Sequence, residues 1–482
     1  MGDHGDSRDL EQFGYRQQLR RSMGAFSSFA VAFSLISVFT GVFANFGHGF
    51  RQVGGGLVWS WLVVLGGQTL VALLLAELST RLPLSGYGYQ WTSRLLNPHV
   101  GFFVGWLLTL QFLTGFPGVC ATLAAQVGTA LGGRWGEPSG IASLTLMVIG
   151  LIAMVHLFGI RLASVVNNTG VWTELLGVAG VSLALVVLAW RGGASTAVLG
   201  DTTNSATGLP AGAGAWALSL LVGAWCLTGF EAAADLAEET HQPRRVVPRA
   251  ILLSLLGSGA AGFLLLTGVM LMTEDLRTAQ QEANPLMGVM GRALGSGWMT
   301  VVMGVVGISV FACGLASMAA TSRLLFALAR DRMLPGSRWL GAVVEGQRTP
   351  RNAIVFVWAV SSAVVLGLPT LDIITQISAV AGYLGYAGIV VAALRAPAIR
   401  PSEGFRLGAA RPWIGVAALL WVLGVVAALT VPATPLAGIS TDHLPAVSTA
   451  VALGFGGLLY LGLIRGRLLR GEAGPPSVPP IS

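Results

Sequence analysis

The chain has 482 residues, of which 54% are hydrophobic and only 10% are charged. A soluble protein carries about a quarter of its residues as charged side chains, so this composition excludes a soluble globular protein and indicates an integral membrane protein. All 28 basic residues are arginines, and the net charge is +7. Because these arginines are scattered among short loops, the sequence disfavours nucleic-acid binding.

The apolar runs predict an all-α membrane protein with about twelve spanning helices, since one crossing needs roughly 20 mostly apolar residues. In chain order, the expected spans are 24–46, 55–80, 100–130, 140–159, 163–190, 213–240, 248–273, 299–330, 353–369, 372–395, 413–431 and 444–464. The longest external loops are expected at 191–212 and 274–298. No cleavable signal peptide is expected before the first span.

Three parts are predicted along the chain. Residues 1–22 form a polar cytoplasmic tail, residues 23–466 form one transmembrane domain, and the Pro-rich residues 467–482 form a disordered cytoplasmic tail. With the N-terminus inside, only five arginines face outward, and the other 23 of the 28 face inward. This bias follows the positive-inside rule. We therefore expect a multi-pass protein of a bacterial cell membrane with both termini cytoplasmic. The outward-facing arginines are Arg51, Arg134, Arg191, Arg277 and Arg292.

Two of the predicted spans are interrupted. The first reads FSLISVFTGVFANF and the sixth reads WCLTGFEAAADL. Helix-breaking residues at matching positions of two halves point to the binding site of a carrier, whereas small residues that only help helices pack are the alternative. Because the interruptions are five spans apart, the two halves would be inverted repeats. The interrupting residues are Ser37, Thr40 and Gly41 in the first span and Thr228, Gly229 and Glu231 in the sixth.

Several segments resemble one known family. The stretch GFEAAADLAEETHQPRRVVPRAI resembles the span 6 to span 7 signature of the amino acid–polyamine–organocation superfamily. LAELSTRLPLSGYGYQW is similar to the end of its span 2, and SRLLFALARDRMLP to the end of its span 8. The N-terminal FGYRQQLRRSMGAFSSFAVAFSLISVFTGVF resembles the amino acid/choline transporter branch. The similarity covers roughly residues 10 to 400.

This resemblance implies a carrier fold with two inverted five-span repeats and broken helices 1 and 6. The repeats would cover about 23–190 and 213–395, followed by two extra spans at about 413–464. In the family, backbone amides at the first break meet the substrate carboxylate, and the second break lies opposite. The substrate-binding residues implied here are Ser37, Val38, Phe39, Thr40 and Gly41, with Thr228, Gly229, Phe230 and Glu231.

Elementary physics supports a substrate site at the breaks. Unwinding frees backbone N–H and C=O groups, which are tolerated at membrane depth only where they line a cavity or meet a ligand. The amide end of a half-helix suits a carboxylate, and freed carbonyls at the opposite end of a half-helix suit an ammonium. Two broken helices can therefore bind a zwitterion without a charged side chain.

Two acids are expected deep in the membrane. A charge there is costly, and burial favours the protonated form of a carboxyl group, so each acid is a functional hypothesis. Glu231 is predicted to couple or gate transport, with a neutral cap of the broken backbone as the alternative. Glu174 is either a proton site or a hydrogen-bonding residue. Related carriers use a lysine in span 5, but this chain contains none.

Other residues have more local interpretations. Glu77 is expected to pair with Arg81 one helical turn away. The acids after the second break, Asp235, Glu238 and Glu239, would fall on one helical face. Glu238 and Glu239 are expected to form an interfacial ion-pair cluster or cytoplasmic gate near Arg244, Arg245 and Arg249, with substrate contact as the alternative, and Asp235 is intermediate between the two. Small residues four apart in span 8 would line the cavity, hold sodium or simply pack: Ser309, Cys313 and Ser317. Three aromatic residues would either close the cavity or pack: Phe39, Trp225 and Phe230.

The predicted function is secondary active transport of an amino acid or related amine such as GABA across the plasma membrane. Alternating access with symport of H+ is expected, with Na+ as the alternative ion. A choline, ethanolamine or polyamine permease and an exchanger stay open as alternatives. A multi-span enzyme is disfavoured because the six histidines are far apart and no HExxH or Gly-x-Ser-x-Gly motif occurs at a plausible site. We expect no cofactor or metal. Cys120, Cys226 and Cys313 all fall inside apolar runs and are expected to be packing residues rather than a disulfide pair or a metal site.

Overall fold

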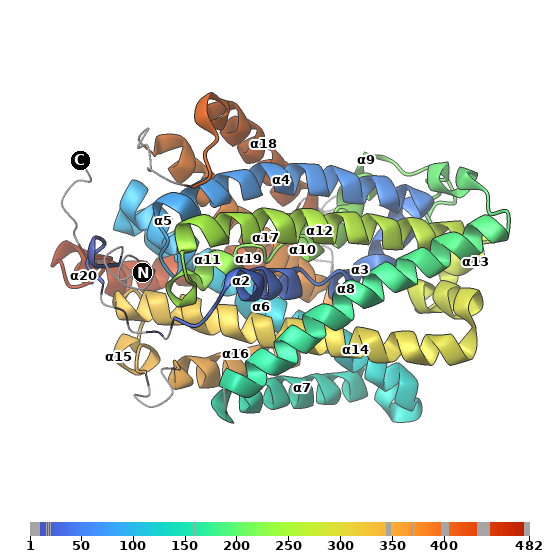
Figure 1. Ribbon diagram of the computed structural model, residues 1–482, viewed down its shortest axis with the longest axis horizontal. Helices are drawn as coiled ribbons and strands as arrows, with labels where there is room; N and C mark the ends of the chain where they lie inside the picture. Colours follow the sequence, from blue (N-terminus) through green and yellow to red (C-terminus); the bar gives the residue numbers. More distant parts are fainter. Residues whose placement is uncertain are drawn as a thin grey trace.

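The computed structural model is almost entirely helical (Figure 1). It describes all residues except 1–9, 16, 18, 20, 159, 344–348, 368–369, 397–403, 431–443 and 477–482. Isolated bridges join Met23 to Thr240 and Thr203 to Pro210, and no described residue belongs to a longer strand. The predicted all-helical class is therefore confirmed.

The long helices run side by side along the longest axis of the molecule (Figure 1). In chain order the α-helices are α2 (Ala25–Ile36), α3 (Val38–Val53), α4 (Leu57–Arg81), α5 (Tyr87–Leu95), α6 (Pro98–Leu131), α7 (Pro138–Phe158), α8 (Ile160–Arg191), α9 (Ala213–Ser219), α10 (Leu221–Cys226), α11 (Ala232–Asp235), α12 (Pro243–Leu271), α13 (Leu276–Gln281), α14 (Pro285–Arg330), α15 (Ser337–Leu340), α16 (Arg351–Gly367), α17 (Leu371–Arg395), α18 (Arg411–Thr430), α19 (Leu444–Leu459) and α20 (Arg465–Leu469). The short 3-10 helix η4 (Ala237–Glu239) follows α11.

The helices have the length and apolar character of membrane spans. Nine stretches of the described chain are long and apolar enough to cross a bilayer, and one of them, Ala25–Arg81, contains α2, α3 and α4 together. Shorter apolar helices lie at Ala213–Cys226 and Arg351–Gly367. The protein is thus a multi-pass membrane protein, while the count of about twelve crossings and the inverted repeat stay predictions.

One predicted external loop is wrong in detail. Residues 274–298 hold α13 and the first turns of α14 rather than an irregular connection. Gly295, at a φ of 76°, interrupts α14, so the predicted span 299–330 corresponds to the part after this kink. Pro285 at the first position of α14 and Asn284 as its N-cap explain why a helix starts in this polar region.

Both predicted helix interruptions are present. Ser37 separates α2 from α3 with a φ of 27°, a value that is uncommon for a residue other than glycine. The second break separates α10 from α11, and Gly229 within it has a φ of 106°. A glycine is needed there because no Cβ is present to clash in this conformation.

Glycines also bring the two breaks into contact. A Cβ on Gly41 would lie 2.2 Å from the Cys226 sulfur, so the missing side chain lets α3 approach α10 closely. A Cβ on Gly229 would lie 2.8 Å from Cγ of Leu35 at the end of α2. The substitution of either glycine would therefore push the broken helices apart.

The other long helices surround the broken pair. α6 packs along α17, α12 along α4, and α14 along α8. α2 packs against α8, α12 and α14, whereas α3 packs against α10 and α14. Large apolar side chains such as Leu176, Leu366 and Trp413 are exposed on the outside. Contiguous apolar surface of this kind suits contact with lipid.

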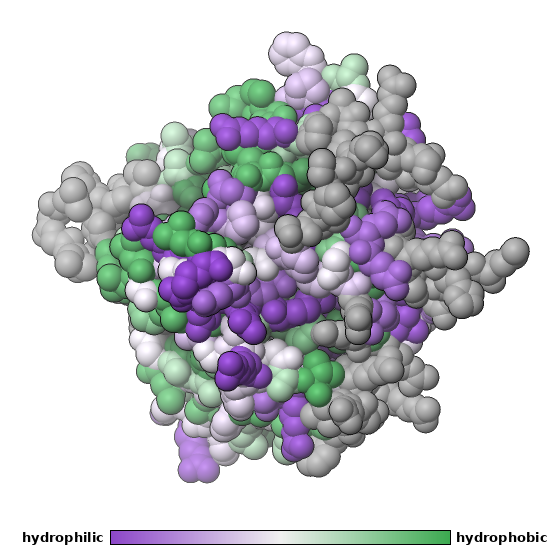
Figure 2. Space-filling model, turned by 90° about the vertical axis from the view of Figure 1, so that its left-hand side faces the viewer, coloured by the Kyte–Doolittle hydropathy of each residue, from purple (hydrophilic) through white to green (hydrophobic). Residues whose placement is uncertain are grey.

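The two ends of the bundle differ. We call the end that carries α5, α15 and α20 the terminal face, and the end that carries α9 and α13 the loop face (Figure 1). Figure 2 views the terminal face and shows hydrophilic residues across its middle, with hydrophobic residues toward its edges. A bundle with an apolar belt and a polar end is the arrangement expected at a membrane surface.

The described parts of both tails pack against the bundle, and for the C-terminal tail this differs from the predicted disorder. In the N-terminal segment Leu10, Phe13, Tyr15 and Leu19 are buried. The predicted disordered tail from residue 467 instead continues as α20, and the Gly474 amide donates a hydrogen bond of 2.9 Å to the Asp331 carbonyl. Gly471 and Gly474 have positive φ values, which allow the chain to turn back toward Asp331. The Pro-rich composition alone does not predict this turn.

The contact between α3 and α10 generates a stability prediction. We expect Gly41→Ala to lower the melting temperature of the purified protein, because overpacking a tight interface costs about 1–3 kcal/mol. Gly66→Ala is the matched control, since a Cβ on this exposed α4 glycine meets no atom within 4 Å. Equal melting temperatures for the two variants would contradict the proposed close approach.

Candidate functional site

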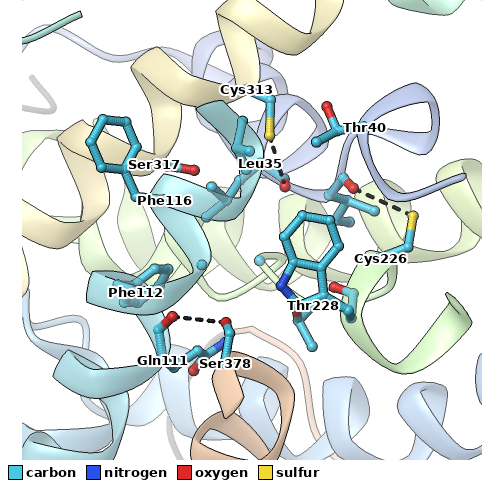
Figure 3. A pocket seen from close by; sticks show the side chains of 15 residues that line it. Leu35, Thr40, Gln111, Phe112, Phe116, Cys226, Thr228, Cys313, Ser317 and Ser378 are labelled. Carbon is cyan, nitrogen blue, oxygen red and sulfur yellow. Dashed lines mark hydrogen bonds between the residues drawn. The ribbon is translucent and has the colours of Figure 1, made fainter. Parts of the chain in front are cut away.

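A small cavity lies between the two breaks (Figure 3). Its volume is 40 Å³. One buried water needs about 10–15 Å³, so the cavity holds a few water molecules and is too small for an amino acid. The structure is therefore contracted around this site.

The cavity wall is built from seven segments, and no described residue on it is charged. It comprises Leu35 and Ile36 of α2, Thr40 of α3, Gln111, Phe112, Gly115, Phe116 and Val119 of α6, Trp225 and Cys226 of α10, Thr228 and Gly229 of the second break, Cys313 and Ser317 of α14, and Ser378 of α17. Hydroxyl, amide and thiol groups thus alternate with aromatic rings. Such a wall suits a small ligand with polar and apolar parts.

Thiols face the carbonyl end of α2. The Cys313 sulfur lies 3.5 Å from the Leu35 carbonyl oxygen, and the Cys226 sulfur lies 3.6 Å from the Ile36 oxygen (Figure 3 draws thiol contacts to this end of α2). A thiol is a weak hydrogen-bond donor. These carbonyl groups therefore keep much of their capacity to attract a stronger donor such as an ammonium.

The amide end of α3 meets Glu174. The Ser37 hydroxyl accepts a hydrogen bond of 3.3 Å from the Thr40 amide and so caps this end in part. Glu174 of α8 is 1% exposed, and its carboxyl group interacts electrostatically with the Ser37 hydroxyl and with the backbone of Val38 and Phe39. None of these contacts has the full geometry of a hydrogen bond to either carboxyl oxygen. The partial positive charge of a helix start attracts a negative group, so Glu174 faces an anion site without filling it.

Glu231 has a different environment. Its carboxyl oxygens accept hydrogen bonds from the Gly229 amide at 2.9 Å and from Nε2 of Gln111 at 3.3 Å. The side chain is fully buried but does not reach the cavity wall, whereas Gln111 does. Glu231 thus holds the backbone of the second break in place.

Side chains satisfy other backbone groups freed at the second break. Nε2 of Gln68 in α4 donates a hydrogen bond of 2.9 Å to the Leu227 carbonyl, and the Thr228 hydroxyl donates one of 2.7 Å to the Trp225 carbonyl. Phe230 stacks on the Tyr386 ring with a centroid distance of 5.9 Å. These contacts allow irregular backbone to exist at membrane depth.

The structure places only some of the predicted site residues on the cavity wall. Of the nine predicted for substrate binding, the wall includes Thr40, Thr228 and Gly229. The remaining six are buried in the breaks behind it: Ser37, Val38, Phe39, Gly41, Phe230 and Glu231. Of the predicted α14 face, Cys313 and Ser317 line the cavity, whereas the Ser309 hydroxyl donates to the Val305 carbonyl.

The sequence reasoning missed the contribution of α6 and α17. Gln111 and Ser378 are polar wall residues on these helices, and the Ser378 hydroxyl donates a hydrogen bond of 2.8 Å to the Gln111 carbonyl. An amide in the middle of an apolar span is a signal that would have identified Gln111. Phe112 and Phe116 carry no such signal, because a wall aromatic and a packing aromatic look the same in sequence.

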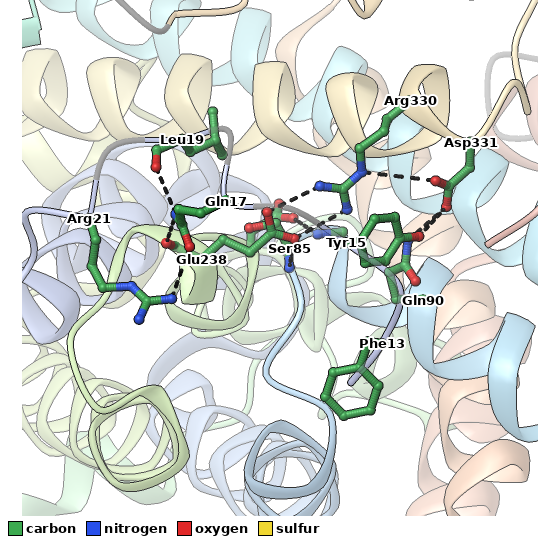
Figure 4. Close-up of polar contacts among 12 residues, drawn as sticks. Phe13, Tyr15, Gln17, Leu19, Arg21, Ser85, Gln90, Glu238, Arg330 and Asp331 are labelled. Carbon is green, nitrogen blue, oxygen red and sulfur yellow. Dashed lines mark hydrogen bonds and ion pairs between the residues drawn. The ribbon is translucent and has the colours of Figure 1, made fainter. Parts of the chain in front are cut away.

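Side chains close the terminal face (Figure 4). One oxygen of the buried Asp331 carboxylate, directly after α14, accepts three hydrogen bonds: from Tyr15 at 2.8 Å, Tyr89 at 2.7 Å and Gln90 at 2.8 Å. Burial raises the pKa of Asp331, while Arg330 and the three donors oppose this shift. The N-terminal segment, α5 and α14 therefore meet at one carboxyl group.

The ion pairs of the terminal face differ from the prediction. Arg330 donates two hydrogen bonds to Glu238, at 3.1 and 3.2 Å, and Arg323 donates one of 3.0 Å to Glu239. The predicted partners Arg244, Arg245 and Arg249 were wrong because α11 ends at Asp235 and η4 then turns the acids toward α14. The predicted local pair of Glu77 and Arg81 is confirmed.

The N-terminal segment is tied to the same place. The amides of Ser22 and Met23 donate to the Glu239 carbonyl at 3.0 and 2.9 Å, and the His241 amide donates to the Met23 carbonyl at 2.9 Å. The guanidinium of Arg330 also lies 3.9 Å from the centre of the Tyr15 ring. This latch, formed by the described residues between 10 and 23 (10–15, 17, 19 and 21–23), η4 and the end of α14, closes the terminal face.

Comparisons with known proteins agree with this architecture. Residues 23–455 match the sequence model of a family described as amino acid permease. The chain is 26% identical to the amino-acid permease BAT1 of Arabidopsis thaliana over 92% of both chains, and 25% identical to its homolog in Oryza sativa over 89% of this chain and 88% of that protein. It is 27% identical to the thiamine transporter thi9 of Schizosaccharomyces pombe, over 81% and 73%. These relatives are from plants and a fungus and give no support to the predicted bacterial source.

The buried pair in the latch generates a testable difference. We expect Arg330→Gln to lower the melting temperature strongly, because it leaves the fully buried Glu238 carboxylate unpaired, which typically costs about 3–5 kcal/mol. Arg470→Gln is the control, since the Arg470–Glu472 pair is exposed and should matter little. If both variants have the melting temperature of the wild type, the Arg330–Glu238 pair of the latch does not stabilise the protein.

Proposed function

The chain belongs to the amino acid permease family, and from this premise we propose that its central cavity binds an amino acid zwitterion between the two broken helices. The protein is a secondary transporter of amino acids or related organic cations. One observation carries the proposal: backbone groups of opposite partial charge, carbonyls from one helix and amides from another, meet at the same cavity. The carbonyl end of α2 and the amide end of α3 both meet it, and the described residues of its wall are uncharged.

Each pole of the substrate has a matching site. The ammonium would replace the thiols of Cys226 and Cys313 at the carbonyls of Ile36 and Leu35, because a charged donor makes a stronger hydrogen bond than a thiol. The carboxylate would meet the start of α3 near Thr40. The substrate side chain would then lie among the aromatic residues of the wall.

An organic cation is the second candidate substrate. The similarity to a protein named as a thiamine transporter favours it, as does the carbonyl pole, which binds an ammonium without needing a carboxylate. A cation such as choline would use only half of the site. We therefore place the zwitterion first and include choline and thiamine in the test.

Glu174 is the better proton carrier of the two buried acids. Glu231 already accepts two hydrogen bonds, whereas no contact of the Glu174 carboxyl group with a described residue has the full geometry of a hydrogen bond. A substrate carboxylate at the start of α3 would approach Glu174, and two neighbouring negative charges favour protonation of one of them. The titratable groups that interact with Glu174 are the thiols of Cys226 and Cys313. Substrate and proton would thus bind together.

Proton coupling is favoured over sodium coupling by the same residues. A sodium ion between α2 and α14 would meet the Cys313 sulfur beside the Leu35 carbonyl. Hard cations prefer oxygen ligands, and a thiol is a poor substitute. We infer that the terminal face is cytoplasmic, because the five arginines that lie toward the loop face are a small minority of the 28.

Uptake into proteoliposomes tests the proposed function. We expect an inward proton gradient to drive accumulation of a labelled amino acid, with neutral amino acids, GABA, choline and thiamine compared in parallel and a sodium gradient as the control. Accumulation of choline or thiamine alone would replace the zwitterion with an organic cation. Flux that no gradient accelerates would contradict symport.

The roles of the two acids generate a prediction for paired variants. We expect Glu174→Gln to keep substrate exchange but to lose accumulation in a proton gradient, because its amide cannot take up the coupling proton. Glu231→Gln should keep the response to the gradient and lower stability by about 1 kcal/mol through a weaker cap. Gradient-driven accumulation by the Glu174 variant at the wild-type level would exclude Glu174 as the coupling residue.

The cysteines allow a test of the cavity wall. In variants that retain a single cysteine, we expect a small membrane-permeant methanethiosulfonate to block transport through Cys226 or Cys313, and substrate to protect both. Cys120 is buried but does not belong to the wall, so a variant that retains only Cys120 should resist the reagent. Equal sensitivity of all three variants would contradict the assigned wall.

A further inference from the structure

A second hollow lies on the terminal face, away from the central cavity. Its volume is 720 Å³. Its wall, here called the α2–α12 groove, comprises Ala25 of α2, Gln242, Arg245, Val246, Pro248, Arg249 and Leu252 at the start of α12, and Gly404 and Phe405 before α18. None of these residues takes part in the proposed transport, so the groove requires its own explanation.

The groove is positively charged. Arg245 and Arg249 are exposed and lie one helical turn apart, and none of the described residues on the wall is acidic. Among the residues that the structure describes, Arg249 makes no ion pair, so its guanidinium is available to an anion. Two arginines at this spacing can bind one phosphate from two sides.

Apolar residues continue the same face of α12. Leu252 and Leu256 follow Arg249 after three and seven residues and therefore lie above it on one helix face. Leu256 is 46% exposed and belongs to the apolar surface of the bundle. Within the groove, Val246, Pro248 and Phe405 add further apolar surface. The positive charge at the terminal face matches the phosphate headgroup of a phospholipid. The apolar surface along α12 matches its acyl chain.

The starts of the neighbouring helices strengthen the positive potential. α2 begins after Gly24 and α12 begins after Gln242, and in neither helix does the N-cap side chain make a capping hydrogen bond. Neither helix has an acidic residue in its first turn. Uncapped helix starts attract anions. This contribution supplements the arginines, on which the assignment depends.

We propose that the α2–α12 groove binds an anionic phospholipid of the surrounding bilayer. Its phosphate lies at Arg245 and Arg249, and an acyl chain follows Leu252 and Leu256. A soluble anion would not explain the apolar half of the groove. Because Ala25 starts α2, the bound lipid joins α2 to α12 and stabilises the latched terminal face, independently of which substrate the protein transports.

Thermal unfolding in detergent tests this site. We expect dioleoylphosphatidylglycerol to raise the melting temperature more than dioleoylphosphatidylcholine does. Arg249→Gln should weaken the apparent affinity for the anionic lipid about tenfold, and Arg249→Lys should restore part of it. Arg465→Gln is the matched control, because Arg465 is an exposed arginine of α20 outside the groove.

Four outcomes would overturn the proposal. They are an unchanged lipid response in the Arg249→Gln variant, an equal response to the zwitterionic lipid, an equal loss in the Arg465→Gln variant, and an equal stabilisation by inorganic phosphate alone. The third would indicate unspecific attraction to basic residues, and the last a site for a soluble anion. None of these results depends on transport, so failure of the lipid site is distinguishable from failure of the proposed substrate site.

Discussion

A membrane interior offers no water to a broken helix, so the amides and carbonyls that a break releases have to find partners within the protein. This constraint organises the centre of the molecule. Gln68 and Glu231 satisfy backbone groups of the second break, while thiols of Cys226 and Cys313 meet the carbonyl end of α2 only weakly. The second break is therefore held by strong hydrogen bonds, whereas the first break keeps the capacity to bind a ligand.

The same asymmetry separates the two buried acids. The Glu231 carboxyl group accepts a hydrogen bond from the amide of Gly229, the glycine at which the chain bends. This carboxyl group therefore stabilises the fold of the second break. Glu174 comes from a different helix and faces the start of α3 without a hydrogen bond. A group that is already satisfied resists a change of protonation, while an unsatisfied one responds to a new charge beside it. The different roles proposed for them follow from their partners rather than from their depth.

The terminal face couples the tails to the transport core. Tyr15 and Asp331 join the N-terminal segment to the end of α14, and Glu238 joins the second broken helix to the same place through Arg330. In the alternating access proposed here, opening of this face would require these contacts to separate together. Because most of them are buried, the closed arrangement is cooperative, and anything that holds α2 against α12 would favour it.

The sequence by itself determined the membrane class, the helical spans, both breaks and the local pair of Glu77 and Arg81, because each depends on residues that are neighbours along one segment. The tertiary structure decided that Gln111 lines the cavity and that Glu238 pairs with Arg330 rather than with the basic loop that follows it. These partners lie on different helices, many residues apart. Helix propensity and apolar periodicity are local properties, but which helix faces another depends on packing of the whole bundle, which no single segment encodes.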